Sequence, residues 1–213
     1  MFNKSIVMLD FETTGLSPDF GARVTEVAAV RIDGNKIVDR FVSLINCNVR
    51  IPGFITEITG ITQQMVDAAP CPSIVMPRLM QFIGTDILAA HNACFDAKFL
   101  LSENRRLGLK PHSKDLLCSL MLSRRIFPGL SSYKLTNLSR SFSINFKSRA
   151  HRAEADAEVA ANLLIHIGQH VRTSYNLMSF DPHIFNEINK ISAAKVTRFL
   201  QNKFVANAKD SQE

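Results

Sequence analysis

The sequence predicts an α/β fold in which helices flank a mixed β-sheet and a helical extension follows at the C-terminus. A β-hairpin near the start of the chain indicates antiparallel strands, and the strand–helix alternation after it indicates parallel ones. The longest helical segment begins with five alanines among its first nine residues. Such small side chains suit a helix that lies close to a sheet.

The expected strands are short runs of apolar or β-branched residues. Residues 5–9 are expected to form a buried central strand, and residues 86–90 a second one. Segments 24–32 and 36–45 read as an antiparallel hairpin, because the Asp-Gly-Asn sequence at 33–35 is a turn signal.

Helical patterning predicts helices at 62–82, 95–107, 114–127, 135–142 and 153–171. Prolines at 70 and 72 are expected to break the first of these, and Gly108 to end the second. After residue 171, apolar residues at near-helical spacing predict one more amphipathic helix, with a polar tail from Asn202. We therefore divide the chain into a main domain at 1–171 and a helical extension at 172–213.

The composition is that of a globular protein, with 213 residues of which 46% are hydrophobic and 21% charged. No uninterrupted apolar run is long enough to span a bilayer, and the first ten residues do not resemble a signal peptide. We therefore expect a soluble, cytoplasmic protein without a membrane partner. Four scattered cysteines without a CxxC pair favour reduced thiols over a zinc site.

The chain is basic, with a formal charge of +6 and a pI near 9.3, which favours a polyanionic partner without proving one. Between residues 96 and 152, twelve basic residues face three acidic ones, a net charge of +9. We expect only a minority to contact phosphate, since some lie on solvated helix faces. The twelve are Lys98, Arg105, Arg106, Lys110, Lys114, Arg124, Arg125, Lys134, Arg140, Lys147, Arg149 and Arg152.

Asp10 and Glu12 form the first candidate site, at the end of the first expected strand. Residues i and i+2 of a strand point to the same face, so the two carboxylates repel each other unless a cation lies between them. The alternative is that they are ordinary acids at the end of a strand. The turn Thr13-Thr14-Gly15 that follows offers small side chains and free backbone N–H groups, which suit a sugar or phosphate.

His91, Asn92 and Asp96 form the second candidate site, directly after the strand at 86–90. Ligands in α/β folds bind beyond the carboxyl ends of strands, where these side chains are expected. Asp96 falls in the first turn of the following helix. It is equally well explained as an acid that complements the helix dipole.

His151 and Asp156 form the third candidate site. Five helical residues advance about 500°, so these side chains share a site only if His151 precedes the helix that carries Asp156. The alternative is a solvated loop histidine and an exposed helix acid. Glu154 and Glu158, at i and i+4 on the same helix, are expected to lie on its solvated face.

Three motifs together resemble those of the DEDDh 3′–5′ exonucleases in order and spacing. They are Asp-Phe-Glu-Thr-Thr-Gly at 10–15, His-Asn-Ala-Cys-Phe-Asp at 91–96 and His-Arg-Ala-Glu-Ala-Asp at 151–156. The resemblance covers residues 4–170 and extends to the proofreading epsilon subunit of bacterial DNA polymerase III and its stand-alone relatives. It implies a ribonuclease H-like fold, and His151 excludes the sister class that has tyrosine in the third motif.

The resemblance implies that four carboxylates hold two divalent ions, Mg²⁺ or Mn²⁺. Asp10 would bridge the ions, Glu12 and Asp156 would complete the one that carries the attacking water, and Asp96 would support the other. These oxygen ligands suit Mg²⁺ or Mn²⁺ and not zinc. His151 would be the general base, and the product a nucleoside 5′-monophosphate.

The resemblance also implies a set of substrate-binding residues. The backbone of Thr13 and Thr14 would meet the terminal 3′-hydroxyl and Leu16 would pack on the base, whereas Phe95 has the alternative of belonging to the core. The set comprises Thr13, Thr14, Gly15, Leu16, Asn92 and Phe95.

Three functions remain open on the sequence. The first is a DNA 3′–5′ exonuclease in proofreading or repair, and the second is an RNA-trimming exonuclease of the same chemistry, since the motifs do not report on the 2′-hydroxyl. The third is a non-catalytic nucleic-acid-binding or polymerase-associated module, which would have no use for four clustered carboxylates. The expected partner is the 3′ end of a nucleic acid, with a polymerase subunit or another replication or repair protein as a further candidate. The extension is expected to be non-catalytic and to pack on the catalytic domain rather than on a partner.

Overall fold

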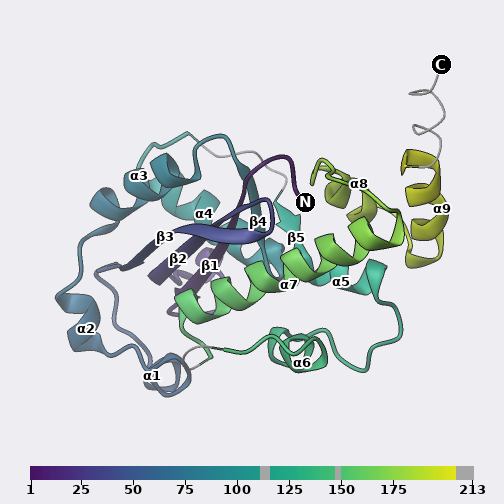
Figure 1. Ribbon diagram of the computed structural model, residues 1–213. Helices are drawn as coiled ribbons and strands as arrows, with labels where there is room; N and C mark the ends of the chain where they lie inside the picture. Colours follow the sequence, from purple (N-terminus) through teal and green to yellow (C-terminus); the bar gives the residue numbers. More distant parts are fainter. Residues whose placement is uncertain (111–115, 147–149, 205–213) are drawn as a thin grey trace.

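The computed structural model describes residues 1–110, 116–146 and 150–204, and within them five strands form one mixed sheet in the order β3-β2-β1-β4-β5 (Figure 1). The antiparallel pairs are β1–β2 and β2–β3, and the parallel pairs are β1–β4 and β4–β5. This arrangement confirms the predicted mixed sheet. The strands are β1 (Ile6–Thr13), β2 (Val24–Asp33), β3 (Lys36–Leu44), β4 (Ile87–Ala90) and β5 (Leu117–Cys118).

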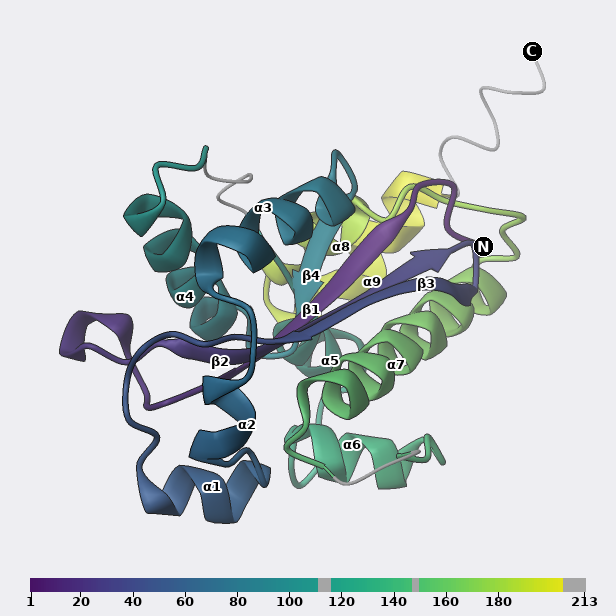
Figure 2. The same cartoon turned by 90° about the vertical axis from the view of Figure 1, so that its left-hand side faces the viewer.

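Helices cover both faces of the sheet, with α7 across one face and α3 and α4 on the other (Figures 1 and 2). No helix among the described residues is long and apolar enough to cross a membrane. The helices are η1 (Pro18–Phe20), α1 (Gly53–Thr59), α2 (Gln63–Asp67), α3 (Pro72–Ile83), α4 (Ala93–Arg106), α5 (Ser119–Ile126), α6 (Leu135–Ser141), α7 (Ala153–Ser174), α8 (Ile184–Asn189) and α9 (Ala193–Phe204).

The central strand β1 is buried on both sides because its apolar residues alternate between two cores. Ile6 and Met8 belong to the core under α7, whereas Val7 and Leu9 belong to the core under α3 and α4. The same alternation directs every even-numbered residue of β1 towards α7. Any carboxylate at position 10 or 12 therefore faces that helix.

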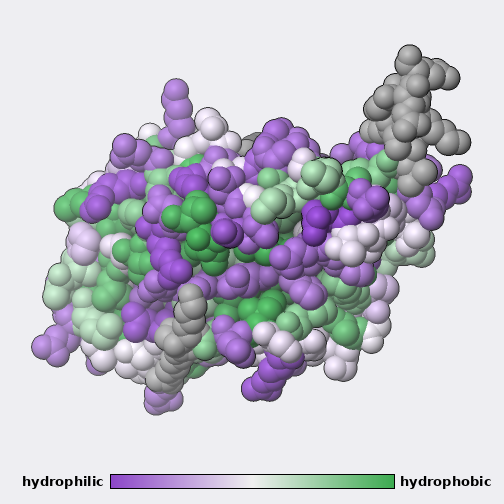
Figure 3. All heavy atoms as spheres, in the orientation of Figure 1, coloured by the Kyte–Doolittle hydropathy of each residue, from purple (hydrophilic) through white to green (hydrophobic). Residues whose placement is uncertain are grey.

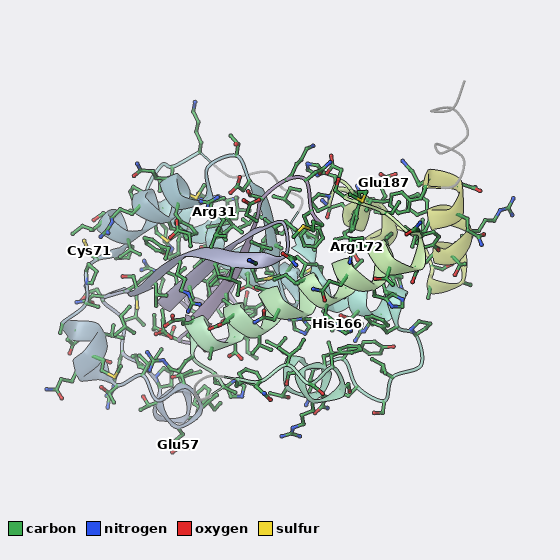
Figure 4. All side chains as sticks on the ribbon, viewed as in Figure 1. Arg31, Glu57, Cys71, His166, Arg172 and Glu187 are labelled. Atoms are coloured by element: carbon green, nitrogen blue, oxygen red, sulfur yellow. The ribbon has the colours of Figure 1, made fainter. Side chains whose placement is uncertain are left out.

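Helix α7 lies close to the sheet, as its small residues predicted. Ala153, Ala157 and Ala161 are fully buried, and α7 contacts both β1 and β2. At Gly168 a Cβ atom would lie 2.5 Å from the Phe2 ring, so any larger residue there would require that ring to shift. On its far side His166 projects towards α6, where its ring centroid lies 4.6 Å from that of Phe142 (Figure 4). The surface around α7 mixes hydrophilic and hydrophobic residues (Figure 3).

The predicted helix at 114–127 was wrong in part. Leu117 and Cys118 form the edge strand β5, paired with Ala89 and Ala90, because the free edge of β4 offers hydrogen bonds that outweigh local helical patterning. Helix α5 begins only at Ser119, and residues 111–115 of the predicted segment lie outside the described residues.

The C-terminal segment forms two helices, α8 and α9, and not the single helix predicted. The N–H groups of Lys190 and Ile191 bond to carbonyls three residues back, which tightens and ends α8. The break lets residues of both helices, including Phe185 and Leu200, enter the core under α7. Helix α7 itself continues to Ser174, and the division of the chain at residue 171 stays a prediction.

Candidate active site

Asp10 and Glu12 lie within β1, two residues apart, and face the first turn of α7. One carboxylate oxygen from each of Asp10, Glu12 and Asp156 lies within 4.8 Å of the others. The strand register shifts between Glu12 and Thr13, directly after the two carboxylates. Three carboxyl groups from two elements thus meet at one point.

Asp96 adjoins this cluster from a third element. It lies in the first turn of α4, where it is only 2% exposed. Its Oδ1 atom accepts a hydrogen bond of 3.1 Å from the N–H group of Phe11, which stands between Asp10 and Glu12 in the chain. A solvated acid that merely complements the helix dipole would not be buried against β1, so the structure favours the site interpretation.

The local environment disfavours ionisation of all four carboxyl groups. Burial, followed by repulsion from Asp156 and Glu26, raises the pKa of Glu12 to about 8. Burial also raises the pKa of Asp96 to about 8, against the opposing hydrogen bond from Phe11. The pKa values of Asp10 and Asp156 are raised as well, in both cases mainly by burial. A bound cation is the ordinary way to keep such carboxylates ionised at neutral pH.

His151 stands outside α7, as the spacing argument required. It is exposed and has a φ of 63°, in the left-handed region that residues other than glycine rarely adopt. Its backbone N–H donates a 2.8 Å hydrogen bond to Oδ2 of Asp156. The backbone is therefore tied to the carboxylate cluster, while the imidazole remains at the surface.

The turn after β1 differs from the prediction in one respect. The N–H group of Thr14 is not free, because it donates a 2.9 Å hydrogen bond to the carbonyl of Arg23 as the chain returns towards β2. Thr13 and Thr14 are both buried, and the Thr13 hydroxyl bonds to the Gly15 carbonyl. Leu16 is 89% exposed. Of these predicted contacts, the Leu16 side chain is the most accessible to a ligand.

The residues of the second motif, at 91–96, differ in how far they are exposed and in what they contact. Asn92 is exposed, has a φ of 66° and precedes α4. The half-buried ring of Phe95 packs against Phe99, with centroids 4.9 Å apart, which favours the core alternative for Phe95. His91 is held by contacts of 3.0 Å to the Ser119 hydroxyl and 3.2 Å to the Tyr133 carbonyl. Burial lowers the pKa of His91 to about 4, so it is a neutral residue that ties β4 to the segments after it.

Glu26 is a residue of the site that the sequence reasoning missed. It lies on β2 directly opposite Glu12 and is 2% exposed. Its carboxylate accepts hydrogen bonds from the Arg152 guanidinium at 2.6 and 3.1 Å and from the Ala153 N–H at 3.0 Å. Glu26 thereby fixes the start of the helix that carries Asp156. The available signal was a lone acid within the otherwise apolar run at 24–30.

Glu158 was wrongly placed on a solvated face. It is 7% exposed and lies 3.4 Å from Nη1 of Arg40 on β3, whereas Glu154 is exposed and contacts the same guanidinium. Because α7 lies so close to the sheet, the Glu158 side chain is covered by β3, whereas Glu154 at the start of the helix stays exposed, as predicted. The pairs with Arg40 add a second connection between the sheet and the start of α7.

Not all of the twelve basic residues are available to a ligand. Arg152 is paired with Glu26, and Arg125 is only partly exposed. Lys114, Lys147 and Arg149 lie outside the described residues. The exposed cations among the described ones are Lys98, Arg105, Arg106, Lys110, Arg124, Lys134 and Arg140.

Comparison with known proteins identifies relatives along most of the chain. A family model described as Exonuclease matches residues 7–164. The chain is 30% identical to the DNA polymerase III epsilon subunit of Aquifex aeolicus, over 83% of this chain and 87% of the relative. It is 36% identical to the 3′–5′ exonuclease DinG of Bacillus subtilis, over 81% of this chain but 18% of that protein. Some of the curated relatives are much longer proteins, and the chain spans only 11 to 18% of their length.

The structural comparison agrees. The solved structure of exonuclease X in complex with 5′ overhanging duplex DNA matches with a TM-score of 0.66 and 26% identity. The match covers 86% of this chain and 99% of the other. The predicted ribonuclease H-like fold is thus confirmed.

We predict that the stability of the metal-free protein falls as the pH rises. The pKa values of Glu12 and Asp96 are about 8 in the folded chain, above their ordinary values of 4.5 and 3.8. Their protonated forms therefore favour folding at low pH, and this contribution is lost as the pH rises through about 8. Melting temperatures in EDTA and in Mg²⁺ check this between about pH 5.5 and about pH 8.5. Mg²⁺ should raise Tm more at the higher pH, and an equal effect at both would contradict the account.

We predict that Glu26→Gln lowers activity because it loosens the start of α7. The amide retains one oxygen acceptor for three donors and loses the charge that pairs with Arg152. We expect a loss of about 10- to 100-fold in kcat/KM. Arg40→Gln is the matched control, because it removes ion pairs to the same helix that are longer and more exposed. It should lower the free energy of unfolding by at most about 1 kcal/mol. Equal activity of the two variants would show that Glu26 is not needed for positioning.

Proposed function

This chain belongs to the exonuclease family whose model matches residues 7–164, and on that premise we propose that it removes nucleotides from the 3′ end of DNA. The reaction is hydrolysis of the terminal phosphodiester bond of a single-stranded or frayed end, with release of a nucleoside 5′-monophosphate, in proofreading or repair. The observation that carries the proposal is the cluster of Asp10, Glu12 and Asp156 with Asp96 beside it. A module that only binds nucleic acid has no use for carboxylates that repel its ligand.

The residues present fit two divalent cations, Mg²⁺ or Mn²⁺. Every candidate ligand is a carboxylate oxygen, which these ions prefer, and a bound cation would keep carboxyl groups with raised pKa values ionised. We assign Asp10 to both ions, Glu12 and Asp156 to one, and Asp96 to the other. When bound, the ions would supply positive charge that stabilises the negative charge developing on the phosphate oxygens.

His151 is assigned the role of general base. The hydrogen bond from its N–H to Asp156 anchors its backbone beside the cluster, and its exposed side chain is free to approach a bound substrate. An imidazole can accept a proton from water near neutral pH, which assists attack on phosphorus. Removing it should slow the reaction without removing the carboxylates that hold the ions.

DNA is the favoured polymer because the chain matches the Aquifex epsilon subunit along nearly all of that protein. The same likeness makes a DNA polymerase or repair protein a candidate partner. The exposed cations on α4 and nearby segments would contact phosphates without regard to sequence. RNA is the alternative substrate of the same chemistry, and the assay that tests the proposal includes both polymers.

A time course on 3′- and 5′-labelled single-stranded DNA and RNA of one sequence tests the proposal. In Mg²⁺ or Mn²⁺ we expect a ladder that shortens from the 3′ end, faster on DNA, and no products in EDTA or with Asp10→Ala. Internal cleavage, shortening from the 5′ end, or the absence of products from both polymers would contradict it.

The proposed role of His151 gives a separate prediction. His151→Ala should lower kcat by about 10²- to 10⁴-fold, because general acid–base catalysis contributes that much, while the rise in Tm caused by Mn²⁺ should stay as in the wild type. His183→Ala is a control for loss of an imidazole elsewhere, before α8, and should retain full activity. A loss of the Mn²⁺-dependent rise in Tm with His151→Ala would show that His151 serves the ion site and not the proton transfer.

A further inference from the structure

The loop at residues 15–22, called here the η1 loop, leaves the sheet directly after the carboxylates of β1. Its two ends are joined by hydrogen bonds of 2.9 Å between Thr14 and Arg23, one from each backbone N–H. Inside the loop, the N–H groups of Gly21 and Ala22 bond to the carbonyls of Pro18 and Ser17. The loop therefore has a defined conformation of its own.

The base of the η1 loop is fixed to α4. The Arg23 guanidinium donates to both oxygens of Glu103, at 2.7 and 2.9 Å, and the Glu103 side chain is only 3% exposed. At Gly15 a Cβ atom would lie 3.3 Å from the Ala22 Cβ, so the two ends of the loop pack closely. Figure 2 shows the loop projecting from the body of the molecule beside α4. Such anchoring restricts the positions that side chains at its tip can adopt.

This fixed loop presents two large apolar side chains to solvent. Phe20 is 93% exposed and Leu16 is 89% exposed. None of the ring–ring contacts among the described residues involves Phe20. Single exposed apolar residues are common, but two on one anchored loop beside a cluster of carboxylates form a surface suited to a ligand.

We propose that Phe20 stacks on an unpaired base of the substrate strand, next to the terminal base assigned to Leu16. This inference rests on the proposed function. Ser17 to Phe20 span three residues of 3₁₀ helix, about 6 Å at a rise of about 2 Å per residue. Because Leu16 directly precedes Ser17 and stacked nucleotides advance about 3.4 Å each, we place the stacked base one to two nucleotides from the terminal base. Aromatic stacking tolerates every base, as an exonuclease that removes each base in turn requires.

The charge of the adjoining helix fits the same ligand. Arg106 is exposed on α4 one turn after Glu103, the residue that binds the base of the η1 loop. A strand whose base stacks on Phe20 would bring its phosphates towards this cation. An aromatic platform beside cations is the combination by which single strands are held without sequence preference.

Binding to a fluorescent single-stranded DNA, measured by anisotropy, tests the inference. The inactive Asp10→Asn protein serves as the parent. It would be compared with two further variants of itself, one that also carries Phe20→Ala and one that also carries Phe20→Tyr, which keeps an aromatic ring. A second set of oligonucleotides lacks the base at the second and third positions from the 3′ end. Met178→Ala is the matched control, because Met178 is 91% exposed and lies beyond α7, before α8.

We expect Phe20→Ala to weaken binding of the intact strand about 5- to 100-fold, and Phe20→Tyr and Met178→Ala to leave it unchanged. For the parent protein, removing the bases at the second and third positions should weaken binding to a similar extent. For the Phe20→Ala protein, whose binding is already weakened, removing these bases should have little further effect on binding. Equal binding by the parent and Phe20→Ala proteins, or an equal effect of base removal on both, would overturn the inference.

The outcome is separable from that of the proposed function. A protein that hydrolyses DNA from the 3′ end, but binds it equally with and without Phe20, would retain the function and refute the stacking role. A protein that does not hydrolyse DNA, yet loses binding with Phe20→Ala only on intact strands, would retain the stacking role and refute the function. No binding of DNA by any of the variants would refute both.

Discussion

The repulsion among buried carboxylates is the constraint on which the rest of the site depends. Asp10, Glu12 and Asp156 bring oxygens within 4.8 Å of one another, and Asp96 lies against the same strand. Burial, with a smaller contribution from repulsion between the carboxylates, raises their pKa values, so holding the four groups ionised together costs free energy in the absence of a cation. The fold must therefore supply enough rigidity to keep them in place.

That rigidity comes from contacts between elements that are distant in the sequence. Backbone N–H groups of Phe11 and His151 bind the carboxylates of Asp96 and Asp156 directly. Glu26 fixes the start of α7 through Arg152 and Ala153, and small residues let the helix approach the sheet closely enough for this to happen. The site is thus a junction of β1, α4 and α7, held by the packing of α7 on the sheet.

Local sequence patterns were enough to predict the parts of this junction that depend on spacing. The alternation of β1 placed Asp10 and Glu12 on one face, and the spacing of His151 and Asp156 required a loop before α7. Glu26 was missed because its role depends on partners 126 and 127 residues away, which no local pattern reveals. Strand β5 and the break before α9 were missed for the same reason, since pairing and packing with distant segments decide them.

The most direct test of the central claim is a calorimetric titration of the metal-free protein with Mn²⁺ near neutral pH. Two buffers of different ionisation enthalpy would be used, so that the number of protons released can be measured. Carboxyl groups with raised pKa values must lose protons when a cation binds, so the account predicts saturable binding with net proton release, both reduced in Asp10→Asn. Binding without proton release, or equal binding by Asp10→Asn, would contradict it.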